Sequence, residues 1–204
     1  EDESAARLAA RLTAAMRRAA QPAASRIDAL TGLPNRVLFA DLLQHEFDRA
    51  NRYRRALALV LLAPDRLAGA TGEIGGPAAD GLIVDLAAAL RPMIRDVDTL
   101  ARLGAGHLAL LLPETDAKGA QAAGARVHTG ASAARRGGAA PRTVAVGLAA
   151  LPGRGIARAG DLLGRAAEAL VQARRAGGDR VVAFDAPDVI WTREAPDADA
   201  LLGD

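Results

Sequence analysis

The sequence predicts an α+β domain, in which helices cover a five-stranded and mainly antiparallel sheet. The first observation is that the apolar residues change repeatedly between helical spacing and short extended runs. The second is the order of these segments, which is helix, strand, helix, hairpin, helix, strand, helix, strand. The third is the length of 204 residues, which suffices for one compact domain with appendages. Runs of this kind give one sheet layered with helices.

Four helices are predicted within the domain by apolar stripes at helical spacing. The first runs from position 35 or 36 to about 53, and its stripe includes Leu38, Leu42 and Phe47. The last ends near Gly177, a residue suited to the position after a helix C-terminus. This last helix is predicted at 161–175, and the two helices between the first and the last are predicted at 78–94 and 116–134.

The predicted strands are short runs of aliphatic residues. Residues 56–63 form a buried strand, and a tight glycine turn makes a hairpin of the two runs that flank it. The glycine-rich stretch 69–77 is a loop, and it lacks the Gly-Lys-Ser/Thr ending of a P-loop. The hairpin strands and the two later strands are predicted at 99–103, 108–112, 143–148 and 180–184.

Both ends of the chain are predicted to lie outside this domain. Residues 1–24 read as a linker helix with a seam that includes Leu8 and Leu12, at coiled-coil spacing but under three heptads long. We expect it either to form a homodimer or to pack on its own domain. Because the chain starts at Glu1 without Met, we expect a fragment of a longer protein, with a sensor upstream or an effector downstream. The domain itself is expected at 25–185, followed by an acidic, irregular tail at 186–204.

Composition excludes several classes of protein. Aromatic residues make up 2% of the chain and the net charge is only +2, which argues against a nucleic-acid polymer as partner. Cysteine is absent, so there is neither a disulfide framework nor a thiolate metal site. The sequence contains no run of 18 apolar residues, the length that would suggest a membrane span. We expect a cytoplasmic domain, or the cytoplasmic part of a larger membrane-associated protein.

The stretch Asp28-Ala29-Leu30-Thr31-Gly32-Leu33-Pro34-Asn35-Arg36 resembles the opening signature of GGDEF domains, the bacterial diguanylate cyclases. Segments at the positions of the family's first strand, signature hairpin, later strand and terminal helix follow in the same order, over about residues 28–185. The resemblance implies the palm-like fold of nucleotide cyclases. Active members condense two GTP into cyclic di-GMP, with divalent metal on the phosphates.

The resemblance implies that the metal carboxylates are missing from this chain. In the family one comes from the end of the first strand and one from the signature turn, and these positions are Ala63 and Gly106 here. His107 follows in the turn, and it is either a poor oxygen substitute or simply a strand residue. We therefore expect no catalytic residue, no metal ligand and no enzymatic activity.

The same resemblance places vestigial GTP-binding residues at Asp80 and Arg174. Asp80 falls at the family's guanine-reading aspartate, or alternatively is a first-turn aspartate that complements a helix dipole. Arg174 falls at the phosphate-binding lysine, whereas the guanine-reading Asn position holds Thr71 and a phosphate arginine position holds Gly178. We expect no cofactor, and Mg²⁺ only if GTP still binds.

A second site is implied by Arg95, Asp98 and Arg126. Many cyclases carry an inhibitory Arg-x-x-Asp site five residues before the signature turn, with a further arginine from the next helix, and these residues occupy those places. Arginine forks bind phosphate oxygens and guanine edges, and an aspartate accepts from guanine donors. The alternative is a surface ion pair between Arg95 and Asp98, three residues apart.

The sequence therefore predicts an inactive GGDEF domain that acts as a cyclic di-GMP receptor in signal transduction. Cyclic di-GMP is the expected ligand, and GTP is the other candidate. One alternative is a GTP-binding regulatory domain for an attached phosphodiesterase, which would use Asp80 and Arg174. Another is a ligand-free dimerisation module, and a third is an active cyclase with rearranged metal ligands.

Overall fold

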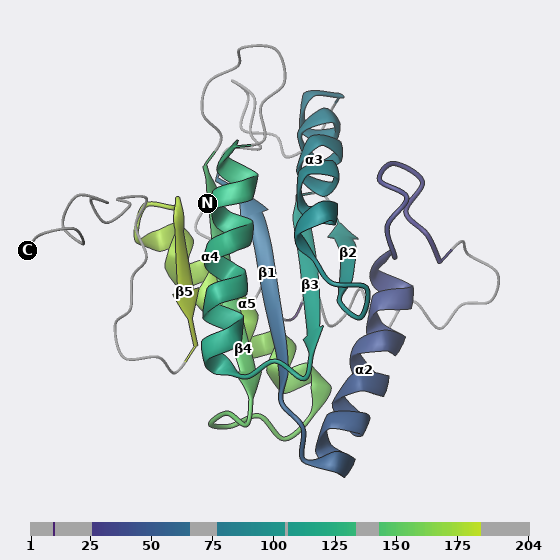
Figure 1. Ribbon diagram of the computed structural model, residues 1–204. Helices are drawn as coiled ribbons and strands as arrows, with labels where there is room; N and C mark the ends of the chain where they lie inside the picture. The colour runs from purple at the N-terminus through teal and green to yellow at the C-terminus, as the bar shows by residue number, and fades with distance from the viewer. Residues whose placement is uncertain (1–9, 11–25, 66–76, 105, 134–142, 185–204) are drawn as a thin grey trace, which may run out of the picture.

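The computed structural model describes residues 10, 26–65, 77–104, 106–133 and 143–184 (Figure 1). Its five-stranded sheet has the order β2-β3-β1-β4-β5. Three of the strand pairings are antiparallel, and only β4 and β5 run parallel. The predicted fold class is therefore confirmed. The predicted linker helix at 1–24, the loop at 69–76, Thr71 and the tail at 186–204 lie outside the described residues, apart from residue 10.

The elements follow the predicted order closely. Their bounds are α2 Arg36–Tyr53, β1 Leu57–Pro64, α3 Pro77–Leu90, the 3₁₀ helix η2 Arg91–Met93, β2 Thr99–Gly104, β3 His107–Pro113, α4 Ala117–Ala133, β4 Val144–Leu151, α5 Ala159–Arg175 and β5 Arg180–Ala183. Helix α2 begins where Asn35 caps it, because the Asn35 side chain accepts hydrogen bonds from the amides of Val37 and Leu38.

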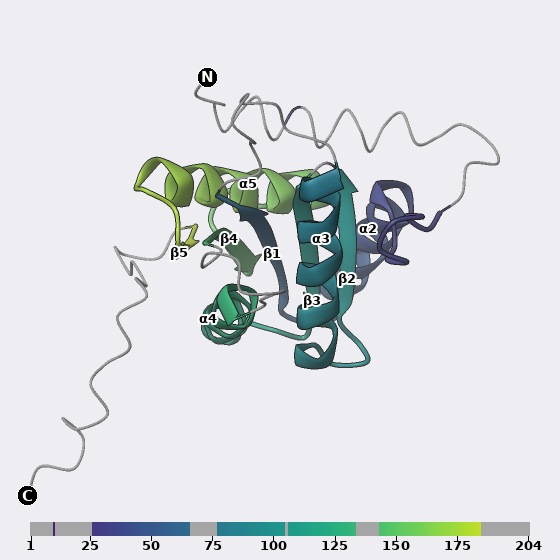
Figure 2. The ribbon, with the colours of Figure 1, turned by 90° about the horizontal axis from the view of Figure 1, so that it is seen from above.

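Strand β1 lies at the centre of the sheet and contributes side chains to two hydrophobic cores. Every one of its residues is buried, because alternate side chains point to opposite faces of the sheet and helices cover both faces. Leu57, Leu59 and Leu61 pack with α2 and α5, whereas Val60 and Leu62 pack with α3 and α4. Figure 2 shows the sheet between these helices, with α5 on one side and α3 and α4 on the other. This two-sided burial explains the uninterrupted apolar run in the sequence.

Helix α3 ends earlier than the sequence predicted. The apolar stripe suggested a helix to residue 94, but the α-helix stops at Leu90 and continues as one 3₁₀ turn over Arg91–Met93. Pro92 lies within that turn. A proline lacks the backbone N–H and disfavours helical geometry in the residue before it, which accounts for the early end.

Helix α5 crosses β4 in direct contact at Gly147. A Cβ atom there would lie 2.1 Å from the Leu170 nitrogen and 2.5 Å from the Ala166 oxygen. Only glycine permits this approach of helix backbone to strand, and it brings the C-terminal end of α5 over the sheet. Among the described residues, no helix is long and apolar enough to cross a membrane.

Candidate functional site

The two positions expected to carry metal carboxylates lie next to each other at one end of the sheet. In the antiparallel pairing of β1 with β3, Leu62 faces Leu108, so Ala63 comes level with the start of β3 at the hairpin turn. Gly106 lies in that turn with a φ of 94°, and His107 begins β3 half-buried. His107 is thus a strand residue, the alternative that the sequence left open.

The described residues at this end do not fit a Mg²⁺ site of the family's kind. Neither Ala63 nor Gly106 has a side-chain oxygen, and Ala63 is fully buried. No group of three or more His, Cys, Asp or Glu residues within the described part of the chain is placed to hold a metal ion. Hard divalent cations prefer several carboxylate or carbonyl oxygens.

Asp65, two residues after Ala63, is committed to another contact. Its Oδ2 accepts a hydrogen bond of 2.8 Å from the backbone N–H of Asp179, at the turn before β5. In that turn a Cβ on Gly178 would lie within 2.6 Å of the Asp65 carboxylate oxygens and carbon. Asp65 therefore shapes this turn, and its carboxylate occupies the space that a side chain at position 178 would need.

The turn before β5 also carries a side-chain contact that the sequence did not indicate. The Nε2 atom of His128, on α4, lies 3.0 Å from Asp179 Oδ1, and His128 is buried. Asp179 has a φ of 46°, which is uncommon for a residue other than glycine. The partners are 51 residues apart, so no local pattern signals the contact.

Both predicted GTP-binding residues lie near this end of the sheet. Asp80 is in the first turn of α3, where its charge complements the helix dipole. Its Oδ1 lies 3.4 Å from Nη2 of Arg102. Arg174, near the end of α5, approaches the carbonyl oxygen of Pro64 at 3.5 Å. The structure thus brings Arg174 to the end of β1, and it gives Asp80 an arginine partner that sequence reasoning had not assigned.

Arg102 in turn holds the segment that precedes α2. Its Nη1 donates to both carboxylate oxygens of Asp28 at 3.1 Å, and its backbone N–H donates to Pro34 at 2.9 Å. Asp28 also accepts from the N–H and hydroxyl of Thr31. Burial acts to raise the pKa of Asp28, but the bonds from Thr31 and Arg102 outweigh it and hold that pKa below its ordinary value.

Arg95 and Arg126, predicted for a second site, come from segments that touch. The Nε atom of Arg126, on α4, donates to the carbonyl oxygen of Met93 at 3.2 Å. Met93 ends η2, two residues before Arg95. A Cβ on Gly130 of α4 would lie 2.2 Å from the Met93 sulfur, so η2 packs tightly on this helix. Both arginines are exposed.

Asp98 does not form the surface ion pair with Arg95 that the sequence suggested as an alternative. It is only 9% exposed, and its Oδ2 accepts from the backbone N–H of Arg95 at 2.9 Å rather than from the guanidinium. The Asp98 N–H donates back to the Arg95 carbonyl at 3.0 Å. Asp98 therefore closes the turn that presents Arg95, while its Oδ1 has no hydrogen-bond partner in the described part of the chain.

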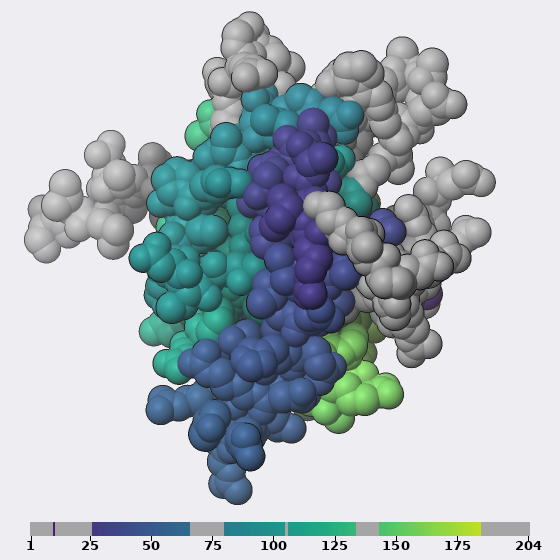
Figure 3. Space-filling view, turned by 90° about the vertical axis from the view of Figure 1, so that its right-hand side faces the viewer, coloured from purple at the N-terminus to yellow at the C-terminus, as the bar shows by residue number. Residues whose placement is uncertain are grey.

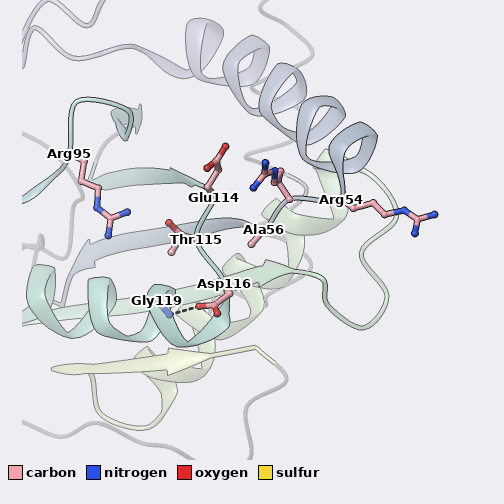
Figure 4. Close-up of a pocket in the computed structure, with 8 residues that line it drawn as sticks. Arg54, Ala56, Arg95, Glu114, Thr115, Asp116 and Gly119 are labelled. Atoms are coloured by element: carbon pink, nitrogen blue, oxygen red, sulfur yellow. Dashed lines mark hydrogen bonds between the residues drawn. The ribbon is translucent and has the colours of Figure 1, made fainter.

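A pocket of about 480 Å³ opens beside Arg95. In Figure 4 Arg95 enters from the segment before β2, and Arg54 and Ala56 come from the junction of α2 with β1. The opposite wall is the junction of β3 with α4. The remaining lining residues are Arg55, Glu114, Thr115, Asp116 and Gly119. Charged side chains of both signs therefore surround a space large enough for part of a nucleotide ligand.

Several curated proteins resemble this chain in sequence. Diguanylate cyclase DgcP of Pseudomonas aeruginosa is 31% identical over 157 residues, which are 76% of this chain and 23% of that protein. Probable diguanylate cyclase DgcC of Escherichia coli K12 is 30% identical over 155 residues, 75% of this chain and 42% of that protein. The chain thus spans less than half the length of these relatives.

Solved structures resemble the fold. Diguanylate cyclase SiaD of Pseudomonas aeruginosa, in complex with its activator SiaC, superposes with a TM-score of 0.68 at 31% identity, over 87% of this chain and 70% of that chain. The FimX GGDEF domain from Pseudomonas aeruginosa gives 0.67 at 29%, over 78% and 99%. The GGDEF domain of DgcB from Caulobacter crescentus, in complex with cyclic di-GMP, gives 0.71 at 24%, over 81% and 97%, which is a likeness of fold.

These comparisons contradict one expectation drawn from the sequence. The replacement of carboxylates by Ala63 and Gly106 had predicted that the chain is not an enzyme. The curated relatives it matches are named diguanylate cyclases, which points instead to an enzyme, and the prediction is therefore wrong. That prediction inferred the loss of an activity from Ala63 and Gly106 alone, within a domain that otherwise matches the family.

The family model described as "Diguanylate cyclase, GGDEF domain" matches residues 25–180. That range includes the whole described sheet up to the start of β5. Fold, strand order and sequence thus agree over most of the chain, which belongs to the GGDEF domain family of diguanylate cyclases.

Proposed function

We propose that this GGDEF domain binds cyclic di-GMP through Arg95, Asp98 and Arg126. The observation that carries the proposal is the contact of Arg126 with the Met93 carbonyl, which holds α4 against the segment leading to Arg95. Arg95 and Arg126 are both exposed, and this contact joins the two segments that carry them. An exposed arginine fork suits phosphate oxygens and the guanine edge.

Asp98 contributes to this site by fixing the backbone of the turn that carries Arg95. By bonding the Arg95 amide, it holds the backbone of the turn in one conformation before any ligand arrives. Preorganisation of this kind reduces the entropy lost on binding. The same bond means that Asp98→Ala should weaken both ligand binding and folding, since a partly buried backbone N–H would lose a charged partner at a cost of about 1–3 kcal/mol.

The test is calorimetric titration of cyclic di-GMP into the wild type and Arg95→Ala at near-physiological salt. Loss of one charge-assisted fork should cost about 2 kcal/mol, which corresponds to roughly a 30-fold rise in Kd. Arg52→Ala is the matched control, because Arg52 is exposed in the last turn of α2 but does not line the pocket. Absence of wild-type binding at high micromolar ligand, or equal affinity of Arg95→Ala and wild type, would refute the proposal.

Condensation of GTP into cyclic di-GMP is the second candidate, and the names of the relatives favour it. The position of Arg174 at the end of β1 and of Asp80 nearby in contact with Arg102 also supports nucleotide binding there. Incubation with GTP and Mg²⁺ or Mn²⁺, followed by chromatography, tests this activity. Cyclic di-GMP above the level of a protein-free blank supports it, and none at any enzyme concentration counts against it.

Association through residues 1–24, with signalling to a sensor or effector module, stays a prediction of the sequence. Sedimentation of the wild type and of Leu8→Glu with Leu12→Glu tests it. A dimer that the paired substitutions dissociate is the expected result, and monomers in both cases would contradict it.

A further inference from the structure

We propose that Glu114 is the carboxylate that recognises the guanine base in the pocket beside Arg95. The inference rests on the proposed binding of cyclic di-GMP and names the residue that sets base specificity. Glu114 and Arg95 line the same pocket of about 480 Å³. A carboxylate and a guanidinium that share one pocket offer acceptors and donors to a single purine.

The backbone of Glu114 has an unusual conformation. Its φ is 51°, in the left-handed region that residues with a Cβ seldom adopt. It follows directly after Pro113, the last residue of β3, and comes just before the α4 helix. Such conformations cluster at ligand-binding sites, where the surrounding structure enforces them. Glu114 lines the pocket with this backbone conformation, and its side chain is 55% exposed.

Arg49 orients that carboxylate. Its Nη2 lies 3.2 Å from Glu114 Oε1, while its Nη1 lies 3.3 Å from Glu46 Oε2 in the preceding turn of α2. Figure 4 shows the Glu114 carboxylate turned toward α2, and Figure 3 shows α2 running along this face of the molecule. A carboxylate has about four lone-pair sites, so one bond to Arg49 leaves Glu114 able to accept two more hydrogen bonds.

Guanine matches this arrangement and adenine does not. Guanine carries two adjacent donors, the N1–H and the 2-amino group, which a carboxylate accepts together. Its O6 and N7 accept from an arginine fork such as that of Arg95. Adenine has an unprotonated N1 in place of the N–H, and its lone pair would face the carboxylate without a proton between them. Glu114 should therefore select guanine over adenine.

Other carboxylates near Arg95 are less suited to this role. Asp98 is almost fully buried and bonded to the Arg95 amide. Asp116 accepts from the Gly119 N–H at 2.8 Å and thereby caps the start of α4. Glu114 combines exposure with a position in the pocket, and Arg49, with which it pairs, is itself exposed.

The test compares cyclic di-GMP with cyclic di-AMP on three proteins by calorimetric titration. Glu114→Gln keeps the size of the side chain but replaces one acceptor with a donor. Glu46→Gln is the control, because it removes the other ion pair of Arg49 without changing the pocket. We expect the wild type and Glu46→Gln to prefer cyclic di-GMP by at least about tenfold, since a bidentate base contact is worth that or more. In Glu114→Gln the affinity for cyclic di-GMP should fall about tenfold, and the preference should disappear.

The outcomes separate this inference from the proposed function. Wild-type binding of cyclic di-GMP with an unchanged preference in Glu114→Gln would overturn the role of Glu114 and leave the Arg95 site intact. No wild-type binding of cyclic di-GMP would overturn the proposed function and the inference together. Thermal melting checks the fold of each variant. If Glu114→Gln were to unfold, Glu114→Gly replaces it, because glycine adopts the same φ without strain, and retained guanine preference there would equally overturn the inference.

Discussion

The bond between Arg102 and Asp28 should be one of the strongest polar contacts in the described fold. It joins β2 to the segment before α2, across 74 residues of sequence. Arg102 and Asp28 are only 13% and 21% exposed in their side chains, so solvent screens the pair weakly. We expect Arg102→Met to destabilise the domain, because it leaves the Asp28 carboxylate without its charged partner.

The loss of unfolding free energy in Arg102→Met follows from the burial of the pair. Removing one partner of a buried pair costs about 3–5 kcal/mol, and partial exposure places this pair near the lower end. The free energy of unfolding should therefore fall by about 3 kcal/mol. At about 2–4 °C per kcal/mol for a chain of this size, Tm should fall by roughly 6–12 °C.

A double-mutant cycle with Asp28→Asn, followed by urea unfolding with circular dichroism, isolates the pair. We expect a coupling energy of about 2 kcal/mol. The control cycle uses Arg165 and Glu168, whose Nη1 and Oε2 atoms lie at a similar distance of 3.0 Å but whose side chains are 34% and 36% exposed. That coupling should stay below about 1 kcal/mol. A coupling between Arg102 and Asp28 no larger than the control would refute the argument from burial.

Two further predictions concern stability. Gly147→Ala should cost about 3 kcal/mol or more in urea unfolding, because the new Cβ would meet the α5 backbone, whereas Gly160→Ala, with nothing within 4 Å, should change it little; equal small effects would contradict the close contact. The lowered pKa of Asp28 means that its contribution is present above the ordinary carboxyl pKa and is lost as the pH falls below about 4. Urea midpoints from pH 7 to 3 should thus fall more steeply for the wild type than for Asp28→Asn, and parallel curves would contradict the assignment.

The sequence by itself determined the elements of this domain. Helix α2 was predicted close to its observed bounds, because an apolar stripe at helical spacing is a local signal. The central strand was equally clear, since a short run of aliphatic residues buried on both faces has no competing interpretation at that length. Pro92 was visible too, but its effect on α3 was misjudged, because the stripe of apolar residues continues past it.

Only the tertiary structure decided how charged residues are partnered. Arg-x-x-Asp spacing suggested a surface ion pair or a ligand site for Asp98, whereas in the fold Asp98 is buried and its carboxylate accepts from the Arg95 amide. The bonds of Arg102 to Asp28 and of Arg126 to Met93 join residues far apart in sequence. Apolar periodicity is repeated many times along an element and can be read locally. A single charged side chain has many partners within reach, and only the packing of the elements selects among them.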